Sequence, residues 1–143
     1  MRTKPITVAE VELTAFSLAK EFMLWNESIP EFGTRFPNKL ESCLGMPFVR
    51  FSRKDLYRGL IGKASVLFYL MIKNHPFQNG NKRIAITTLL VFLSNNKKWL
   101  KMTVNEMYKF AVNIAESESS SFEKILIQIR ETIQNHLVDF VED

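Results

Sequence analysis

Apolar residues recur at helical spacing along most of the chain, and the polar breaks between them predict a bundle of helices. The first stretch begins at Thr7, which forms a capping box with Glu10, and it should be helical to about Leu24. Residues 26–37 contain two prolines and a glycine, so they are predicted to form a loop. A short helix is expected to follow over residues 38–43.

The middle of the chain combines one extended segment with two helices. Residues 44–51 alternate apolar positions around a glycine and a proline, which favours a short hairpin. Ser52 and Asp55 have the spacing of a second capping box, so a helix is expected from there to Lys73. The run 84–93 is apolar on almost every side, which is typical of a helix at the centre of a core.

The last third of the chain predicts two more helices. An extended link over residues 99–102 leads to Thr103, which begins another capping box and a helix. After a serine-rich turn, an amphipathic helix should start at Phe122, and residues 139–143 are expected to be a loose acidic end. His136 lies beside the apolar stripe of this helix without a partner motif, so a structural role is predicted for it.

These patterns predict an all-α fold: a compact helical bundle with a central buried helix and one short β-hairpin. At 143 residues, the chain is expected to form a single domain over 1–143, with its functional core over 38–95. Its 46% of apolar residues and 24% of charged residues indicate a globular protein.

The charge and the apolar runs narrow the function classes. A net charge of +4 allows an acidic partner, but the lysines are scattered, which argues against nucleic acid. The longest apolar run is too short to cross a membrane, and no opening run resembles a signal peptide. The single Cys43 is compatible with a reducing compartment, so the expected location is the cytoplasm.

The candidate chemistry lies in residues 74–83, which read Asn-His-Pro-Phe-Gln-Asn-Gly-Asn-Lys-Arg directly before the central helix. Pro76 should end the preceding helix, because its ring disfavours helical geometry at the residue before it. Gly80 permits a tight turn and a close approach of the backbone to a ligand. His75 carries an imidazole, the side chain that changes charge near neutral pH, and can act as a general base.

The start of the central helix is a predicted anion site. Its first amides lack partners within the helix and lie at the positive end of the helix dipole, where phosphate binds well. Asn81, Lys82 and Arg83 surround these amides. A base beside a phosphate site indicates transfer of a phosphorus-containing group to a hydroxyl.

These ten residues resemble the signature of the Fic/Doc family, His-x-Phe-x-(Asp/Glu)-Gly-Asn-(Gly/Lys)-Arg. Lys82, in place of the Gly of the Fic branch, and Ile86, in place of a second Arg, are similar to the Doc ("death on curing") branch. The resemblance implies a Fic-type bundle in which His75 is the base and Phe77 is a buried peg that holds the loop. It also implies that Gly80, Asn81 and Lys82 form the nest that binds the phosphates of a nucleotide, and that Arg83 binds a terminal phosphate.

One position departs from the family pattern. The acid that helps to hold magnesium in the family is replaced by Asn79. An amide oxygen can ligate magnesium but brings no charge, and this ion depends mainly on carboxylates and substrate phosphates. The resemblance therefore implies ATP as the cofactor, with magnesium only weakly held.

A second resemblance concerns the segment Met46, Pro47, Phe48 and Val49. It is similar to the approach to the family's flap, which docks a target segment by strand addition and presents a hydroxyl to the base. In the alternative interpretation, Phe48 and Phe51 are core residues under a surface loop. The sequence leaves both interpretations open.

The resemblance implies a Doc-like toxin that modifies a hydroxyl of a target protein, such as a translation factor. Lys82 favours transfer of the gamma-phosphate of ATP. The alternatives are AMP transfer, as in the Fic branch, and a catalytically degenerate module that only binds phosphate. The inhibitory helix of Fic proteins reads (Ser/Thr)-x-x-x-Glu-(Gly/Asn), and the segments 17–22 and 119–124 do not complete it. A separate antitoxin protein is therefore the expected partner.

Overall fold

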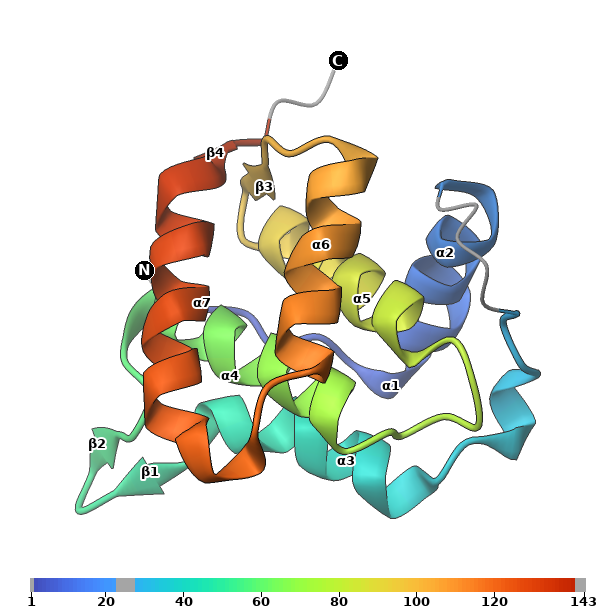
Figure 1. Ribbon diagram of the computed structural model, residues 1–143. Coiled ribbons are helices and arrows are strands. Elements are labelled where there is room, and N and C mark those ends of the chain that lie inside the picture. The colour runs from blue at the N-terminus through green and yellow to red at the C-terminus, as the bar shows by residue number, and fades with distance from the viewer. Residues whose placement is uncertain (1, 23–27, 141–143) are drawn as a thin grey trace.

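The computed structural model describes residues 2–22 and 28–140 and shows a bundle of helices with two small sheets (Figure 1). The helices and strands are α1 (Val8–Glu10), α2 (Phe16–Phe22), α3 (Pro37–Gly45), β1 (Arg50–Phe51), β2 (Lys54–Asp55), α4 (Gly59–Lys73), α5 (Asn81–Asn95), β3 (Lys98–Leu100), α6 (Val104–Ala115), α7 (Phe122–His136) and β4 (Leu137–Asp139). A π-helical turn (Val11–Ala15) joins α1 to α2, and 3₁₀ turns lie at Phe32–Thr34, Met46–Phe48 and Ser119–Ser121. The predicted all-α class is confirmed.

Helix α5 lies in the middle of the bundle and contacts α2, α4, α6 and β3 (Figure 1). Every residue from Arg83 to Leu93 is buried, so the helix has no solvent-facing side over this length. This arrangement confirms the central helix predicted from the run 84–93, although the helix continues to Asn95. Helices α4 and α5 are consecutive and packed together, so the loop between them emerges at one end of the pair.

Two of the predicted helix starts are confirmed by their hydrogen bonds. The hydroxyl of Thr7 accepts a hydrogen bond from the backbone N–H of Glu10, and the Glu10 carboxylate accepts one from the N–H of Thr7. Thr103 and Glu106 make the same reciprocal pair at the start of α6. The predicted end of the first helix, Leu24, lies outside the described residues.

The hairpin is shifted relative to the prediction over residues 44–51. Helix α3 continues to Gly45, and Met46–Phe48 form a 3₁₀ turn, so only Arg50 and Phe51 are extended. They pair antiparallel with Lys54–Asp55. The turn residues Ser52 and Arg53 have φ of 50° and 67°, the positive values that a two-residue hairpin turn requires.

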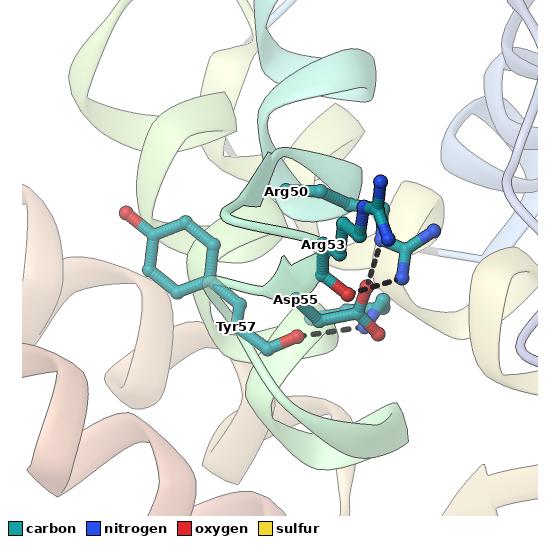
Figure 2. A network of polar contacts seen from close by, with 5 residues as sticks. Arg50, Arg53, Asp55 and Tyr57 are labelled. Carbon is teal, nitrogen blue, oxygen red and sulfur yellow. Dashed lines mark hydrogen bonds and ion pairs between the residues drawn. The ribbon is translucent and has the colours of Figure 1, made fainter.

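The helix predicted from Ser52 therefore begins later, at Gly59. Asp55 does not cap it. Its carboxylate instead accepts a hydrogen bond from Lys63 Nζ at 3.0 Å and lies 3.5 Å from Arg50 Nε (Figure 2). These contacts tie the hairpin to α4 and leave the residues between them out of the helix.

A second sheet was not predicted. Strand β3 pairs antiparallel with β4, with Leu100 opposite Leu137 and Lys98 opposite Asp139. The expectation of a loose acidic end is thus wrong at Asp139, whose carboxylate also pairs with Lys98 Nζ. The two strands lie far apart in the sequence, so no local pattern indicates their pairing.

Candidate active site

The loop that joins α4 to α5 begins with a sharp change in chain direction. The N–H of Asn74 donates to the carbonyl of Leu70 at 2.9 Å and completes the last turn of α4. His75 then adopts a φ of 49°, in the left-handed region that side chains other than glycine seldom occupy. Such a conformation costs about 1–2 kcal/mol, and strain of this kind concentrates at functional sites.

His75 is exposed and lines a pocket of about 250 Å³ at the start of α5. The pocket is also lined by Gly80, Asn81 and Lys82, which the sequence predicted as the anion nest. Its remaining lining residues are Ile72, Gln78, Asn79 and Ala115. The predicted base and most of the predicted phosphate-binding residues therefore face one cavity.

Phe77 anchors the loop in the core, as predicted for a buried peg. Its side chain is 2% exposed, and its ring meets the ring of Phe16 at 5.1 Å in an edge-on arrangement and that of Phe32 at 6.2 Å. Burial of an aromatic ring among other rings contributes a few kcal/mol to stability, roughly 1.5–3 kcal/mol for the side chain alone. The loop is therefore fixed in the middle while His75 remains in solvent.

Gly80 makes the turn into α5. It has φ 71° and ψ 16°, and its carbonyl accepts the first hydrogen bond of the helix from the N–H of Ile84 at 2.9 Å. A Cβ at this position would lie 2.8 Å from the carbonyl oxygen of Ser28. Among the described residues, no side chain caps the helix, and its first amides have no partner within the helix itself.

Arg83 does not line the pocket, unlike Gly80, Asn81 and Lys82. Its side chain is buried, with 7% exposed, and a terminal nitrogen donates a hydrogen bond to the carbonyl of Ala19 in α2. In this conformation its guanidinium anchors α2 to α5 instead of facing the cavity where a terminal phosphate was expected.

Asn79 lines the pocket, and its amide nitrogen donates to Ser28 Oγ at 2.8 Å. Among the described residues, no carboxylate lines the pocket and no group of three His, Cys, Asp or Glu side chains could hold a metal. The oxygen donors among these lining side chains are neutral amides, such as that of Asn79, which fit magnesium poorly.

The residues compared with the family's flap lie at the far end of the α4–α5 pair. The ring of Phe48 packs against Phe92, near the end of α5, and 5.7 Å from Lys63 Nζ in the first turns of α4. His75 follows the other end of α4, about 22 Å away along 15 residues of helix. Figure 1 shows the β1–β2 hairpin and the α4–α5 loop at opposite ends of α4. Met46, Pro47, Phe48 and Val49 therefore do not border the candidate active site.

A different segment lies beside the loop. Ser28 touches Asn79 and Gly80, and the N–H of Phe36 donates to the carbonyl of Pro76 at 2.9 Å. The segment 28–36 thus contacts the α4–α5 loop, whereas residues 46–49, which the sequence compared with a target-docking flap, do not line the pocket. No pattern in a loop so distant in sequence indicates this contact.

The other histidine has a structural position, as predicted. His136 Nδ1 lies 2.7 Å from the carbonyl oxygen of Thr132, and Nε2 lies 3.9 Å from the Glu106 carboxylate. It lines none of the pockets described for the candidate site. Across the described residues, no helix is both long and apolar enough to cross a membrane.

The geometry agrees with a comparison against protein-family models. The model of the Fic/DOC family matches residues 12–93, more than half of the chain, and this span includes the whole α4–α5 loop. Searches of the curated proteins and of the solved structures gave no match. Members of the matched family are typically transferases that act on nucleotides. With its exposed histidine, buried phenylalanine peg and glycine-led helix start, this chain belongs to the Fic/Doc family.

Proposed function

We propose that this protein is a Doc-like transferase that uses ATP to modify a hydroxyl of a target protein. The observation that carries this proposal is the shared pocket: the exposed His75 lines it together with Gly80, Asn81 and Lys82 at the N-terminal end of α5. The first amides of α5 and the Lys82 ammonium supply positive potential where a phosphate would sit. His75 supplies a base within the same cavity.

In the favoured reaction, the target hydroxyl oxygen attacks the gamma-phosphorus of ATP. A bond forms between that oxygen and phosphorus, the bond from phosphorus to the beta–gamma bridging oxygen breaks, and ADP leaves. The hydroxyl proton passes to the imidazole of His75. The chain contributes position and charge, since such a transfer needs little covalent help from the enzyme.

Lys82 is the residue that favours gamma-phosphate transfer. In the family resemblance, lysine at this place accompanies an inverted nucleotide, whereas glycine accompanies AMP transfer. In the alternative reaction, the hydroxyl would attack the alpha-phosphorus and pyrophosphate would leave. The position of Lys82 in the pocket lining supports a direct contact with phosphate, which both reactions use.

The deciding experiment incubates the purified chain and a cytosolic extract with ATP labelled at either the alpha- or the gamma-phosphate. We expect protein labelling from the gamma position only. The matched control is His75→Asn, because asparagine tolerates the left-handed backbone of this position but cannot act as the base. Labelling from the alpha position alone would assign AMP transfer, and labelling that survives in His75→Asn would exclude His75 as the base.

A second candidate function is a degenerate module that binds nucleotide without turnover. It is favoured by the described part of the pocket lining, which offers Asn79 and no carboxylate to a metal. This candidate predicts ATP binding with no transfer from either labelled position. The two functions are thus separated by the labelling experiment together with a binding measurement.

We further propose a cytoplasmic location, a target such as a translation factor, and a separate antitoxin that holds the enzyme inactive. The support is the Doc-like motif and the absence from the sequence of a complete inhibitory motif. Co-expression with the product of the adjacent reading frame tests the antitoxin. We expect a stable complex with lower labelling activity than that of the isolated chain.

A further inference from the structure

A second cavity lies at the opposite end of α4 from His75. It has a volume of about 620 Å³ and lies where the N-terminal segment, the β1–β2 hairpin and the start of α4 meet. Its walls include Arg2 and Pro5 from the first segment and Arg50 from the hairpin. This volume falls within the range of roughly 300–1,000 Å³ that small-molecule sites occupy.

The cavity carries excess positive charge. Arg2, Arg50 and Lys63 line it, and Asp55 is the one acidic residue among its described lining residues. Lys63, which donates a hydrogen bond to Asp55, holds the pKa of that carboxyl below its usual range, as do the nearby charges of Arg50 and Arg2. Asp55 is therefore ionised at neutral pH, and two positive charges remain uncompensated among the lining residues.

Lys63 is a buried cation within this group. Only 4% of it is exposed, yet it lines the cavity, and its ammonium donates to Asp55 at 3.0 Å and to the carbonyl of Tyr57 at 2.7 Å (Figure 2). An ammonium has three donors, and these two contacts use two of them. Its charge is held in place by packing and is far less screened than that of a surface lysine.

Helix α4 adds to this potential. Its first residue, Gly59, lines the cavity, and no side chain caps the helix. A helix of this length places a partial positive charge and unshared N–H groups at its start. Next to the cavity, a smaller pocket of about 210 Å³ shares Arg2 and adds Lys4 and Lys97 to the same end of the molecule.

We propose that this cavity binds a small phosphate monoester, at a site separate from the candidate active site. A phosphate monoester carries close to two negative charges at neutral pH, which matches the uncompensated charge of the lining. The guanidinium groups of Arg2 and Arg50 suit bidentate contacts with phosphate oxygens. Phe48 and Pro5 provide apolar wall for the remainder of the ligand.

A monoester fits better than a nucleic-acid backbone. A phosphodiester carries one charge and continues in both directions, so it suits a cavity lined by a buried lysine less well than a terminal phosphate does. The expected ligand is therefore a phosphorylated small molecule.

The test follows backbone amide shifts of the full ¹⁵N-labelled chain by NMR during titration with inorganic phosphate and with glycerol 3-phosphate. We expect saturable shifts at Gly59 and Leu60. Arg50→Gln and Arg2→Gln should each weaken binding by about tenfold, the effect of losing one hydrogen bond to a charged group. Lys54→Gln is the matched control, since Lys54 is an exposed hairpin cation outside the cavity lining, and it should leave affinity unchanged. Thermal melting of each variant verifies folding.

Three results would overturn the proposal. Shifts confined to Gly80, Asn81 and Lys82 would place phosphate at the candidate active site alone. Equal weakening in Lys54→Gln and Arg50→Gln would indicate general charge attraction. Saturable binding of a short oligonucleotide without terminal phosphates, stronger than that of either phosphate probe, would assign the basic end to nucleic acid.

Discussion

Asn81 and Phe77 are joined by two hydrogen bonds that close a ring across the candidate active-site loop. The N–H of Phe77 donates to Asn81 Oδ1 at 3.1 Å, and Asn81 Nδ2 donates to the carbonyl of Phe77 at 2.9 Å. The first residue of α5 thus holds the backbone of the buried peg. His75 and the helix amides keep their spacing because this pair ties the middle of the loop to the first residue of α5.

Replacement of Asn81 by alanine should therefore loosen the loop. Each hydrogen bond contributes roughly 0.5–1.5 kcal/mol, so we expect the free energy of unfolding to fall by about 1–3 kcal/mol in urea denaturation. Misplacement of the base by about 1 Å should reduce the proposed transfer rate by up to about 100-fold. Asn105→Ala, at an exposed site in α6, is the control and should leave both quantities almost unchanged. Equal stability of Asn81→Ala and the natural chain would show that the ring does not hold the loop.

Gly80 should not tolerate a side chain. Alanine there would adopt a left-handed backbone at a cost of about 1–2 kcal/mol and would also meet the Ser28 carbonyl, 2.8 Å from the added carbon. We expect Gly80→Ala to lower the free energy of unfolding by at least about 2 kcal/mol. Gly45→Ala is the matched control: its φ is −85° and nothing lies within 4 Å, so the change should be neutral or stabilising by up to about 1 kcal/mol. Similar losses in both variants would contradict this account.

Lys82 and Arg83 are neighbours with different predicted roles. Arg83→Met removes a buried donor from the Ala19 carbonyl, so it should lower the free energy of unfolding by about 1.5–3 kcal/mol. Lys82→Met should instead weaken ATP binding by about tenfold, with a smaller loss of stability, because Lys82 lines the pocket. Calorimetric titration with ATP and urea denaturation separate the two effects. Loss of ATP binding in Arg83→Met at unchanged stability would show that its guanidinium turns to the ligand, as the family resemblance implied.

Local sequence patterns correctly predicted the structural features that depend on contacts between residues close in the sequence. The capping pairs at Thr7 and Thr103 form because both partners lie within one helical turn. The start of α5 was likewise visible at Gly80 and Asn81. The buried peg at Phe77 was predicted from its place in the family motif, and the structure buries it.

The features that the sequence did not predict correctly depend on residues that are distant in the sequence. Ser52 and Asp55 have the spacing of a capping box. The Asp55 carboxylate instead accepts a hydrogen bond from Lys63, and Asp55 itself pairs with Arg50 in the hairpin. The orientation of Arg83 is set by the Ala19 carbonyl, which lies 64 positions away in the sequence. Ser28, which accepts a hydrogen bond from Asn79 Nδ2, likewise lies 51 positions from it in the sequence. In each case, a contact made only by the fold overrides a local preference.

The thiol of Cys43 should be unreactive towards alkylating reagents in the native protein. It is fully buried, and burial raises the pKa of its thiol to about 11, against a smaller lowering by the Asn74 amide. The reactive thiolate is therefore scarce, and we expect no alkylation by iodoacetamide at neutral pH until the chain is unfolded. Mass spectrometry before and after denaturation checks this. Rapid native alkylation would show that α3 opens locally.

The raised pKa of the Cys43 thiol also makes the free energy of unfolding depend on pH. The folded chain favours the neutral thiol, whereas the unfolded chain ionises above a pKa of about 8.5, so this contribution to stability is complete below that pH and falls as pH rises towards 11. At about pH 10 the loss should reach roughly 2 kcal/mol. Cys43→Ala lacks the thiol and should not show it. Parallel stability curves for the two proteins from pH 8 to 10 would contradict the prediction.

Asn79→Asp should change the metal dependence of the proposed reaction. The variant adds a carboxylate to a pocket in which no described lining residue carries one, and carboxylates are the protein ligands that magnesium prefers. We expect the magnesium concentration for half-maximal labelling to fall by about tenfold, since one charge-assisted contact is gained. Asn105→Asp, at an exposed site in the first turn of α6, adds the same charge outside the pocket lining and should have no effect. If the natural chain is inert and only Asn79→Asp transfers phosphate, the natural protein is the nucleotide-binding module, because the missing carboxylate is then what prevents turnover. If both proteins label their target with the same magnesium requirement, Asn79 does not contact the metal and the phosphates of ATP alone hold it.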